Sequence, residues 1–321
     1  MAVIGQDISR AKGVLDAGEL VAIPTETVYG LAGNALNPAA VASIFETKNR
    51  PSFDPLIIHV PSLGAAENYV TNIPSPLRKL AEHFWPGPLT LLLPRKSNIP
   101  DIVTSGLDRV AVRVPDHSLS LDLLAQLDYP LAAPSANPFG YISPTSPKHV
   151  NAQLGDKISY ILDGGNCKVG LESTIVGMEE DEIVVYRLGG LDISEIESIV
   201  GKVTVKSHSS SNPQAPGLLE SHYAPTKPFI LGNLNEMVAY YQEREVDFAV
   251  LSLSQSFPAV PVGNQIALSP QADLKDAATH LFAAMRTLDE SNATVILAEL
   301  MPEEGLGKAI NDRLKRASTK G

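Results

Sequence analysis

The side chains best suited to chemistry begin with two cations placed two residues apart, Lys48 and Arg50. They stand where an apolar helical pattern ends, and Pro51 and Pro55 come next along the chain. Proline restricts its own backbone and that of the preceding residue, so the cations stand at a turn of fixed geometry. Lysine binds phosphate as a point charge, and arginine binds it through paired N–H groups. The stretch 48–55 therefore predicts an anion-binding corner, with a solvated helix end as the alternative.

Hydroxyl side chains gather where two short apolar strands end. The residues concerned are Thr25, Thr27 and Tyr29 after residues 20–23, and Ser135, Asn137, Ser143 and Thr145 after residues 131–133. Open α/β sheets bind ligands at the carboxyl ends of their strands. The same residue types also form ordinary turns, so both interpretations stand at this point.

Further candidate site residues lie on strands, and each could instead have an ordinary structural role. His59 ends an apolar strand and is either a catalytic group or a satisfied core histidine. Arg113 faces away from its valine neighbours in an alternating strand, and Arg187 ends another strand. Cys167 has no neighbour that would activate a thiol. Cations and hydroxyls without a nucleophile suit phosphoryl or nucleotidyl transfer, in which positioning and charge neutralisation do the chemistry.

Familiar nucleotide and hydrolase signatures do not occur in this sequence. It contains no Gly-x4-Gly-Lys-Ser/Thr, no Gly-x-Gly-x-x-Gly, no His-Glu-x-x-His and no Gly-x-Ser-x-Gly. A nucleotide would therefore bind in a less common cradle.

Short apolar strands alternate with amphipathic helices, which is typical of an α/β fold. The first predicted domain covers residues 1–205 and includes a hydroxyl- and glycine-rich loop over residues 24–35. Residues 206–227, rich in serine and proline, predict a linker. Alternation resumes over residues 228–321 and predicts a small, Rossmann-like three-layer α/β domain. The strands expected in the first domain are residues 20–23, 56–60, 89–93, 110–115 and 131–133, with a strand and turn over 160–165 and a hairpin over 173–187.

Composition narrows the class of protein. A hydrophobic content of 44% with 19% charged residues is typical of a globular chain, and no apolar run is long enough to span a membrane. The N-terminus lacks signal-peptide features and the chain has one cysteine, so a cytoplasmic location is expected. The net charge is −11, and residues 1–226 carry 16 basic against 24 acidic side chains. Stable direct binding of nucleic acid is therefore not expected.

Six motifs follow one another in an order that resembles the YrdC family. They are Pro24–Leu31, Lys48-x-Arg50-Pro51 with Pro55–His59, Trp85–Thr90, Val112–Pro115, Pro134–Asn137 and Glu172–Val176. The resemblance covers about residues 5–200. His222–Pro225, followed by an α/β domain, resembles the long two-domain form of the family, the threonylcarbamoyladenylate synthases.

The resemblance implies a fold and a reaction. The fold would be a YrdC-like twisted mixed sheet with helices around a large concave cavity. The reaction would convert L-threonine, bicarbonate and ATP into threonylcarbamoyl-AMP and pyrophosphate, so the enzyme would be a nucleotidyltransferase. The product would pass to the tRNA threonylcarbamoyl-transfer machinery, which forms N6-threonylcarbamoyladenosine in tRNAs that read codons beginning with A.

The resemblance also implies roles for residues at matching positions. Those for L-threonine and bicarbonate are Thr27, His59, Arg113, Ala133 and Ser173. Those for ATP are Arg50, Asp54, Thr104, Ser135, Ser143, Arg187 and Tyr223. Lys48 and Arg50 would act as catalytic residues by neutralising the departing pyrophosphate, with Mg²⁺ accompanying ATP.

Two positions depart from the family pattern. Asp54 stands where the family often has asparagine, which places an anion near the phosphates and raises the hypothesis of a metal ligand there. Leu219, Glu220 and Ser221 stand where a basic pair commonly precedes the His-Tyr-Ala-Pro motif. The linker is still expected to act as a lid over the active site, because a lid would keep water from a labile mixed anhydride.

Two other functions compete with this hypothesis. A carbamoyltransferase of hydrogenase maturation contains a similar module, but it also carries zinc-binding cysteine pairs, and this chain has one cysteine. A non-catalytic RNA-binding module is the second alternative, and the acidic balance of residues 1–226 argues against it.

Overall fold

The structure, a computed structural model, describes residues 1–206 and 222–319. The chain divides into two compact units. The first comprises residues 1–139, 144–168 and the described part of 172–219; the second comprises residues 140–143, 169–171 and the described part of 220–321. The predicted linker 206–227 falls largely outside the described residues, so its action as a lid stays a prediction.

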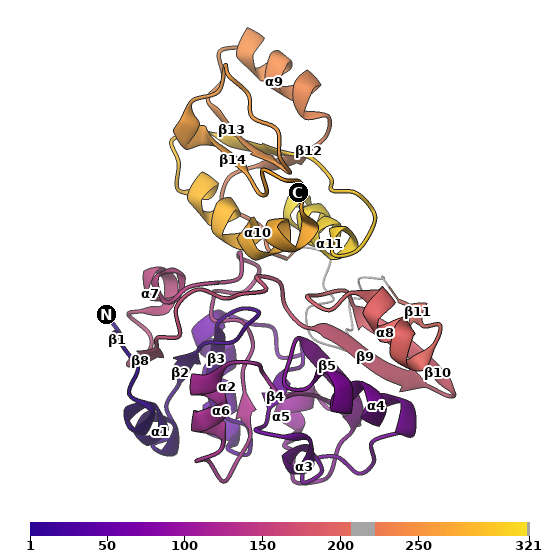
Figure 1. The fold of residues 1–321 in the computed structure, drawn as a ribbon. Coiled ribbons are helices and arrows are strands. Elements are labelled where there is room, and N and C mark those ends of the chain that lie inside the picture. Colours follow the sequence, from indigo (N-terminus) through magenta and orange to yellow (C-terminus); the bar gives the residue numbers. More distant parts are fainter. Residues whose placement is uncertain (207–221, 320–321) are drawn as a thin grey trace. The chain divides into compact units, whose positions relative to one another are not determined.

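The first unit is built on one mixed sheet of eleven strands (Figure 1), in the order β1-β8-β2-β3-β7-β4-β6-β5-β9-β10-β11. Its strands are β1 (Val3–Gly5), β2 (Val21–Ile23), β3 (Gly30–Asn34), β4 (Ile57–His59), β5 (Leu89–Pro94), β6 (Arg109–Arg113), β7 (Leu131–Ala132), β8 (Tyr160–Leu162), β9 (Thr174–Glu179), β10 (Glu182–Arg187) and β11 (Thr204–Val205). Its helices are α1 (Ile8–Asp16), α2 (Pro38–Lys48), α3 (Leu63–Ala66), α4 (Ser75–Phe84), α5 (Asp101–Thr104), α6 (Ser118–Leu124), α7 (Pro147–Leu154) and α8 (Ile193–Val200). The mixed α/β fold expected from the sequence is confirmed.

Helix α2 places Lys48 through signals at both of its ends. The side chain of Asn37 accepts hydrogen bonds from the amides of Ala39 and Ala40, and Pro38 occupies the first turn. Asn49 adopts the left-handed conformation, with φ 52°, and ends the helix. Lys48 is thus the last helical residue, and it is buried with the apolar face of the helix.

Part of the predicted loop over residues 24–35 is instead strand β3. It pairs antiparallel with β2 on one side and with β7 on the other. A Cβ atom at Gly33 would lie 2.9 Å from Cδ2 of Leu20, and one at Gly30 would lie 3.1 Å from Cβ of Ala133. The glycines therefore serve close packing between strands, and the loop that remains spans residues 24–29.

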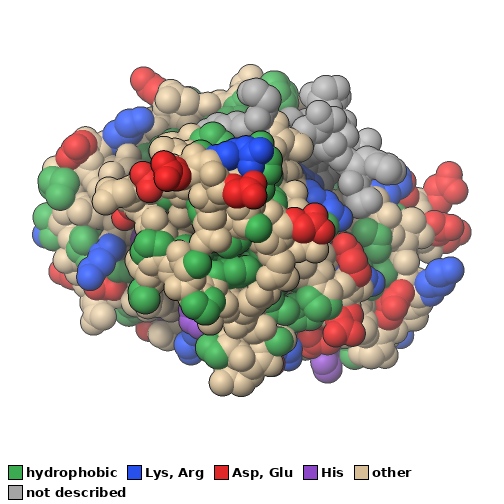
Figure 2. All heavy atoms as spheres, turned by 90° about the horizontal axis from the view of Figure 1, so that it is seen from above, with side chains coloured by type: hydrophobic (Ala, Val, Ile, Leu, Met, Phe, Trp, Pro, Cys, Tyr) green, Lys and Arg blue, Asp and Glu red, His purple; other side chains and the backbone are tan. Residues whose placement is uncertain are grey.

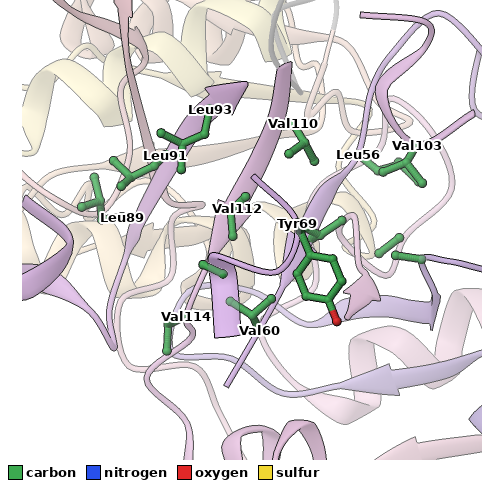
Figure 3. Packing of buried hydrophobic residues seen from close by; sticks show 14 of the residues in the cluster. Leu56, Val60, Tyr69, Leu89, Leu91, Leu93, Val103, Val110, Val112 and Val114 are labelled. Atoms are coloured by element: carbon green, nitrogen blue, oxygen red, sulfur yellow. The ribbon is translucent and has the colours of Figure 1, made fainter. Parts of the chain in front are cut away.

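The core of the first unit lies on one face of strands β5 and β6, as Figure 3 shows. The buried side chains there include Leu89, Leu91, Leu93, Val110, Val112 and Val114. Successive side chains of a strand point to opposite faces. Because alternate residues fill this core, Thr90 and Arg113 point to the other face of the sheet, where Leu92 and Ala111 also lie.

The second unit has a parallel sheet of four strands in the order β12-β15-β13-β14. Its strands are β12 (Phe229–Leu231), β13 (Phe248–Ser252), β14 (Gln265–Ala267) and β15 (Val295–Ala298). Its helices are α9 (Leu234–Glu243), the 3₁₀ helix η1 (Val262–Asn264), α10 (Leu274–Asp289) and α11 (Gly307–Ser318). The expected alternation of strands and helices is confirmed, and β14 is an additional strand.

Within the described ranges, none of the helices combines the length and hydrophobicity needed to cross a membrane. On the face drawn in Figure 2, acidic side chains are mixed with basic and hydrophobic ones.

Candidate active site

Two predicted site residues, His59 and Arg113, form one row across the sheet together with Thr90. His59 at the end of β4 is the register partner of Arg113 at the end of β6. Arg113 is in turn the partner of Thr90 on β5. Cross-strand partners point to the same face of a sheet, so these three side chains lie side by side. Sequence positions 59, 90 and 113 thereby become neighbours.

The guanidinium of Arg113 is fixed from three sides. Its Nη2 donates to Oε1 of Glu26 at 2.6 Å, and its Nη1 donates to Oγ1 of Thr27 at 2.9 Å. Its Nε donates to the carbonyl of Gly87 at 3.3 Å. Both members of the ion pair have only 4% of their side-chain surface exposed, so their charges balance in a dry environment. Arginine has five N–H donors, and these contacts leave two for a ligand.

Thr27 is held by a compact turn that follows β2. Its hydroxyl lies 2.8 Å from that of Thr25, and the Thr25 hydroxyl donates to the carbonyl of Val28 at 2.6 Å. Oγ1 of Thr25 also accepts hydrogen bonds from the amides of Thr27 and Val28. The turn therefore presents Thr27 to Arg113 in one orientation.

His59 is neutral in the folded protein. Burial and the nearby positive charge of Arg113 lower its pKa to about 3. Its Nδ1 is buried and has no hydrogen-bond partner among the residues that the structure describes. A buried polar atom of this kind is rare in native proteins and is commonly satisfied by a ligand or water.

Ser173 stands between Thr90 and Arg187. Its hydroxyl lies 2.7 Å from that of Thr90. Nη2 of Arg187 donates to the carbonyl of Ser173 at 2.9 Å and to its hydroxyl at 3.1 Å. The structure thus joins Ser173, predicted for threonine, to Arg187, predicted for ATP.

Lys48 is buried, with 1% of its surface exposed, and none of its hydrogen-bond acceptors in residues 1–206 and 222–319 is a carboxylate. Its Nζ donates to the carbonyls of Ser135 and Asn137, both at 2.5 Å. Its own carbonyl accepts from the amide of Phe139 at 2.8 Å. Burial and the charge of Arg50 hold the pKa of Lys48 well below its ordinary value. Lys48 therefore fastens the stretch 135–139 through hydrogen bonds to backbone carbonyl groups.

Arg50 and Asp54 form a buried ion pair. Nη2 of Arg50 lies 2.9 Å from Oδ2 of Asp54 and donates to the carbonyl of Pro55 at 2.9 Å. Its Nε donates to the backbone carbonyl of Asp54 at 3.0 Å. No group of three histidine, cysteine or acidic side chains suited to a metal ion occurs in residues 1–206 and 222–319. One arginine does not occupy every lone pair of a carboxylate, so a magnesium-binding role for Asp54 stays a prediction.

The remaining predicted residues have separate surroundings. The hydroxyl of Thr104 donates to the carbonyl of Leu107 at 2.9 Å, a contact internal to the end of α5. Ser135 forms an isolated bridge with Gly30, and Ala133 lies beside the same glycine. These are contacts of the first unit.

Two predicted ATP residues belong to the second unit. Ser143 is fully buried and lies in the segment 140–143. The Tyr223 ring stacks on Phe282 with ring centroids 5.5 Å apart, and the guanidinium carbon of Arg313 lies 5.1 Å from its centroid. Contacts of Ser143 and Tyr223 with a nucleotide stay predictions.

Comparison with known proteins decides the family. Residues 13–189 match the family described as "Telomere recombination", and residues 191–319 match the "Threonylcarbamoyl-AMP synthase, C-terminal domain". The chain is 41% identical to a threonylcarbamoyl-AMP synthase of Pyrococcus abyssi, over 97% of this chain and 94% of that protein. It is 38% identical to a threonylcarbamoyl-AMP synthase of Bacillus subtilis, over 97% and 92% respectively.

The chain belongs to the threonylcarbamoyl-AMP synthase family.

A solved structure extends the likeness to the whole fold. The crystal structure of P. abyssi Sua5 complexed with L-threonine has a TM-score of 0.93 and 39% sequence identity, and the match covers 99% of this chain and 97% of that one. The YrdC resemblance inferred from six motifs is therefore confirmed. The hydrogenase-maturation and RNA-binding alternatives are not favoured.

Two buried polar residues of this synthase-family site carry no role in the sequence-based prediction. Glu26 lies inside the motif Pro24–Leu31, but an acidic residue in a loop does not by itself reveal that it pairs with Arg113. Thr90 ends the motif Trp85–Thr90, and only the register of β5 against β6 brings it to Arg113. The one sequence feature that could have pointed to Glu26 and Thr90 is that each lies inside a motif of the family resemblance.

Proposed function

We propose that this protein synthesises threonylcarbamoyl-AMP and pyrophosphate from L-threonine, bicarbonate and ATP. The observation that carries the proposal is the near-complete match, in sequence and fold, to a synthase-family structure complexed with L-threonine. The product would supply the threonylcarbamoyl group that modifies adenosine in tRNA. Transfer to tRNA would be carried out by separate machinery, because the acidic chain lacks the basic excess that stable nucleic-acid binding requires.

In this proposal the Arg113 side of the site binds the amino acid. The two N–H donors left on Arg113 are suited to a carboxylate or to bicarbonate, since both are planar anions with paired oxygens. The neutral His59 and the hydroxyl of Thr27 provide hydrogen bonds without adding charge. Ser173 and Ala133 would complete this end of the site.

The Lys48 side binds the phosphates of ATP. The threonine nitrogen first takes up the carbon of bicarbonate, which yields a carbamate and water. A carbamate oxygen then attacks the α-phosphorus as the bond to the β-phosphate oxygen breaks, and pyrophosphate leaves. Lys48 and Arg50 would stabilise the charge that develops on pyrophosphate, with Asp54, Thr104, Ser135, Ser143, Arg187 and Tyr223 contributing to nucleotide binding. No covalent protein intermediate is required.

Magnesium enters this proposal as part of the MgATP substrate. The carboxylate of Asp54, which is buried beside Arg50, is the one protein group proposed as a ligand of the ion. The residues of this chain bind and orient the nucleotide, and the ion would add its charge to the phosphate oxygens.

The proposal is tested by measuring pyrophosphate release and identifying the adenylate by mass spectrometry. Pyrophosphate should appear only when L-threonine, bicarbonate and MgATP are all present, together with an equal amount of threonylcarbamoyl-AMP. Reactions that omit each substrate in turn serve as controls. Equal release without threonine would contradict the proposed synthase activity.

A further inference from the structure

One continuous stretch, residues 135–145, carries two predicted ATP residues and is fastened at several places. Its first part is held by Lys48, through Ser135, Asn137 and the amide of Phe139. Near its end, the carbonyl of Pro144 accepts from the amide of Tyr29 at 2.9 Å. The segment 140–143 between these anchors groups with the second unit, where it contacts helix α10 and Ala224, whose amide donates to the carbonyl of Gly140 at 2.9 Å.

Arg286 of α10 holds the backbone of this segment. Its Nη2 donates to the carbonyl of Ile142, and its Nε donates to the carbonyl of Ser143 at 3.3 Å. The guanidinium carbon also lies 5.0 Å from the centroid of the Tyr141 ring. Arg286 is 3% exposed, so these contacts form away from water, where each is hard to replace.

Asp289, one turn along α10, holds the same segment through a side chain. Its Oδ2 accepts from the hydroxyl of Tyr141 at 2.7 Å. The Asp289 carboxylate also accepts hydrogen bonds from the amides of Thr226 and Lys227, both at 3.0 Å, and from the hydroxyl of Thr226 at 2.8 Å. Burial opposes the charge, but these hydrogen bonds keep the pKa of Asp289 below its ordinary value. The carboxylate is therefore a fixed anchor at neutral pH.

A second short segment meets the same helix. Gly170 has φ +78°, and a Cβ atom there would lie 2.5 Å from the carbonyl oxygen of Thr279 and 2.6 Å from that of Ala278. Only glycine fits such a close approach. Helix α10 thus contacts both segments, 140–143 and 169–171, that the first part of the chain contributes to the second unit.

We propose that α10 is a positioning element for ATP, with Arg286 and Asp289 as positioning residues that fix the segment 140–143, which carries the predicted ATP residue Ser143. This rests on the proposed synthase function and gives the C-terminal part of the chain a role in the reaction. Neither residue is assigned a contact with substrate. Their effect should therefore appear in ATP binding more than in threonine binding.

The test compares three variants of the full-length protein with a matched control. Arg286→Met keeps most of the side-chain volume and removes all donors, Arg286→Lys restores one donor group, and Tyr141→Phe removes only the hydroxyl that Asp289 binds. Arg244→Met is the control, because the Arg244 side chain is 49% exposed at the end of α9. Steady-state KM values for ATP and for L-threonine are measured well below each variant's melting temperature.

Arg286→Met should raise the KM for ATP by about three- to tenfold, the loss expected when one or two hydrogen bonds no longer fix the segment. The KM for threonine should change by less than about twofold, the range of an ordinary surface substitution. Arg286→Lys should recover part of the ATP affinity, Tyr141→Phe should show a smaller shift of the same kind, and Arg244→Met should show none.

An unchanged KM for ATP, or an equal rise in both KM values, would overturn the proposal, since α10 would then support folding alone. If Arg286→Met does not fold, the proposal is judged from Tyr141→Phe, again by whether the KM for ATP rises more than the KM for threonine. If the wild-type protein makes no threonylcarbamoyl-AMP, the proposed function fails. The positioning role is then judged from the affinity of the same variants for a non-hydrolysable ATP analogue, measured by calorimetry.

Discussion

The two cationic clusters of the first unit compensate their charges differently. Around Arg113, one arginine meets one buried glutamate, Glu26, and His59 is uncharged, so the formal charge is zero. Around Lys48, Arg50 pairs with the carboxylate of Asp54, and among the described residues the hydrogen-bond acceptors of the lysine are backbone carbonyls. A neutral cluster suits a zwitterionic amino acid, whereas two neighbouring basic side chains suit a polyphosphate. The difference supports assigning threonine to one side and ATP to the other.

The largest expected effect comes from breaking the neutral cluster. Arg113→Met leaves Glu26 buried without its partner, which should lower stability by about 3–5 kcal/mol and abolish detectable threonine binding. Denaturant unfolding and calorimetry with L-threonine measure these effects. The double variant Glu26→Gln/Arg113→Met should recover stability without recovering threonine binding. If the double variant does not recover stability, the unpaired Glu26 is not the main cause of the destabilisation.

Removing the lysine of the cationic cluster should have an intermediate effect. Lys48→Met removes a charge that would stabilise departing pyrophosphate and frees the stretch 135–139, so kcat should fall by about 10²–10³. Threonine affinity, measured by calorimetry, should stay close to that of the wild type. Lys202→Met is the control, because Lys202 is exposed in the first unit. If threonine binding is lost together with turnover, the two clusters are not separable.

The last prediction tests the uncharged state of His59. An unfolded histidine has a pKa near 6.5, and burial beside Arg113 lowers that of His59 to about 3. Between these values the unfolded chain binds more protons than the folded chain. Stability should therefore fall as the pH is lowered from about 6.5 toward 3, by at most about 1.4 kcal/mol per pH unit.

Urea unfolding of wild-type protein and His59→Asn across this pH range measures that contribution. The variant should lack the part of the slope that His59 causes, while other titrating groups contribute equally to both proteins. Identical slopes would mean that His59 is charged in the folded state, and the cluster around Arg113 would then carry a positive charge.

The sequence predicts much of the fold where the pattern of apolar residues is regular. Strands β4, β5 and β6 lie close to the predicted ranges, and helix α2 ends at Lys48, where the apolar helical pattern ends, because apolar periodicity and proline positions mark them. Strand β3 departs from its prediction, since Gly30 and Gly33 resemble loop residues until their neighbours are known. Segments 140–143 and 169–171 could not be assigned to the second unit, because nothing in their local sequence reveals contacts with α10.

For the site, the sequence identifies individual residues better than their partners. Lys48 and Arg113 stand out by residue type and by position on a helix or strand. Their partners, the Ser135 carbonyl for Lys48 and Glu26 for Arg113, are 87 residues apart from them in each case. Such pairs depend on strand order and on backbone atoms, which leave no mark on residue type.

The row formed by His59, Arg113 and Thr90 makes this site sensitive to insertions as well as to substitutions. The three residues belong to neighbouring strands whose register is fixed by backbone hydrogen bonds. One residue inserted within β6 would turn Arg113 toward the valine-rich face and bring a valine to the position opposite His59. A change in the length of a loop between these strands leaves their register unchanged. An insertion within one strand shifts its side chains relative to those of the neighbouring strands.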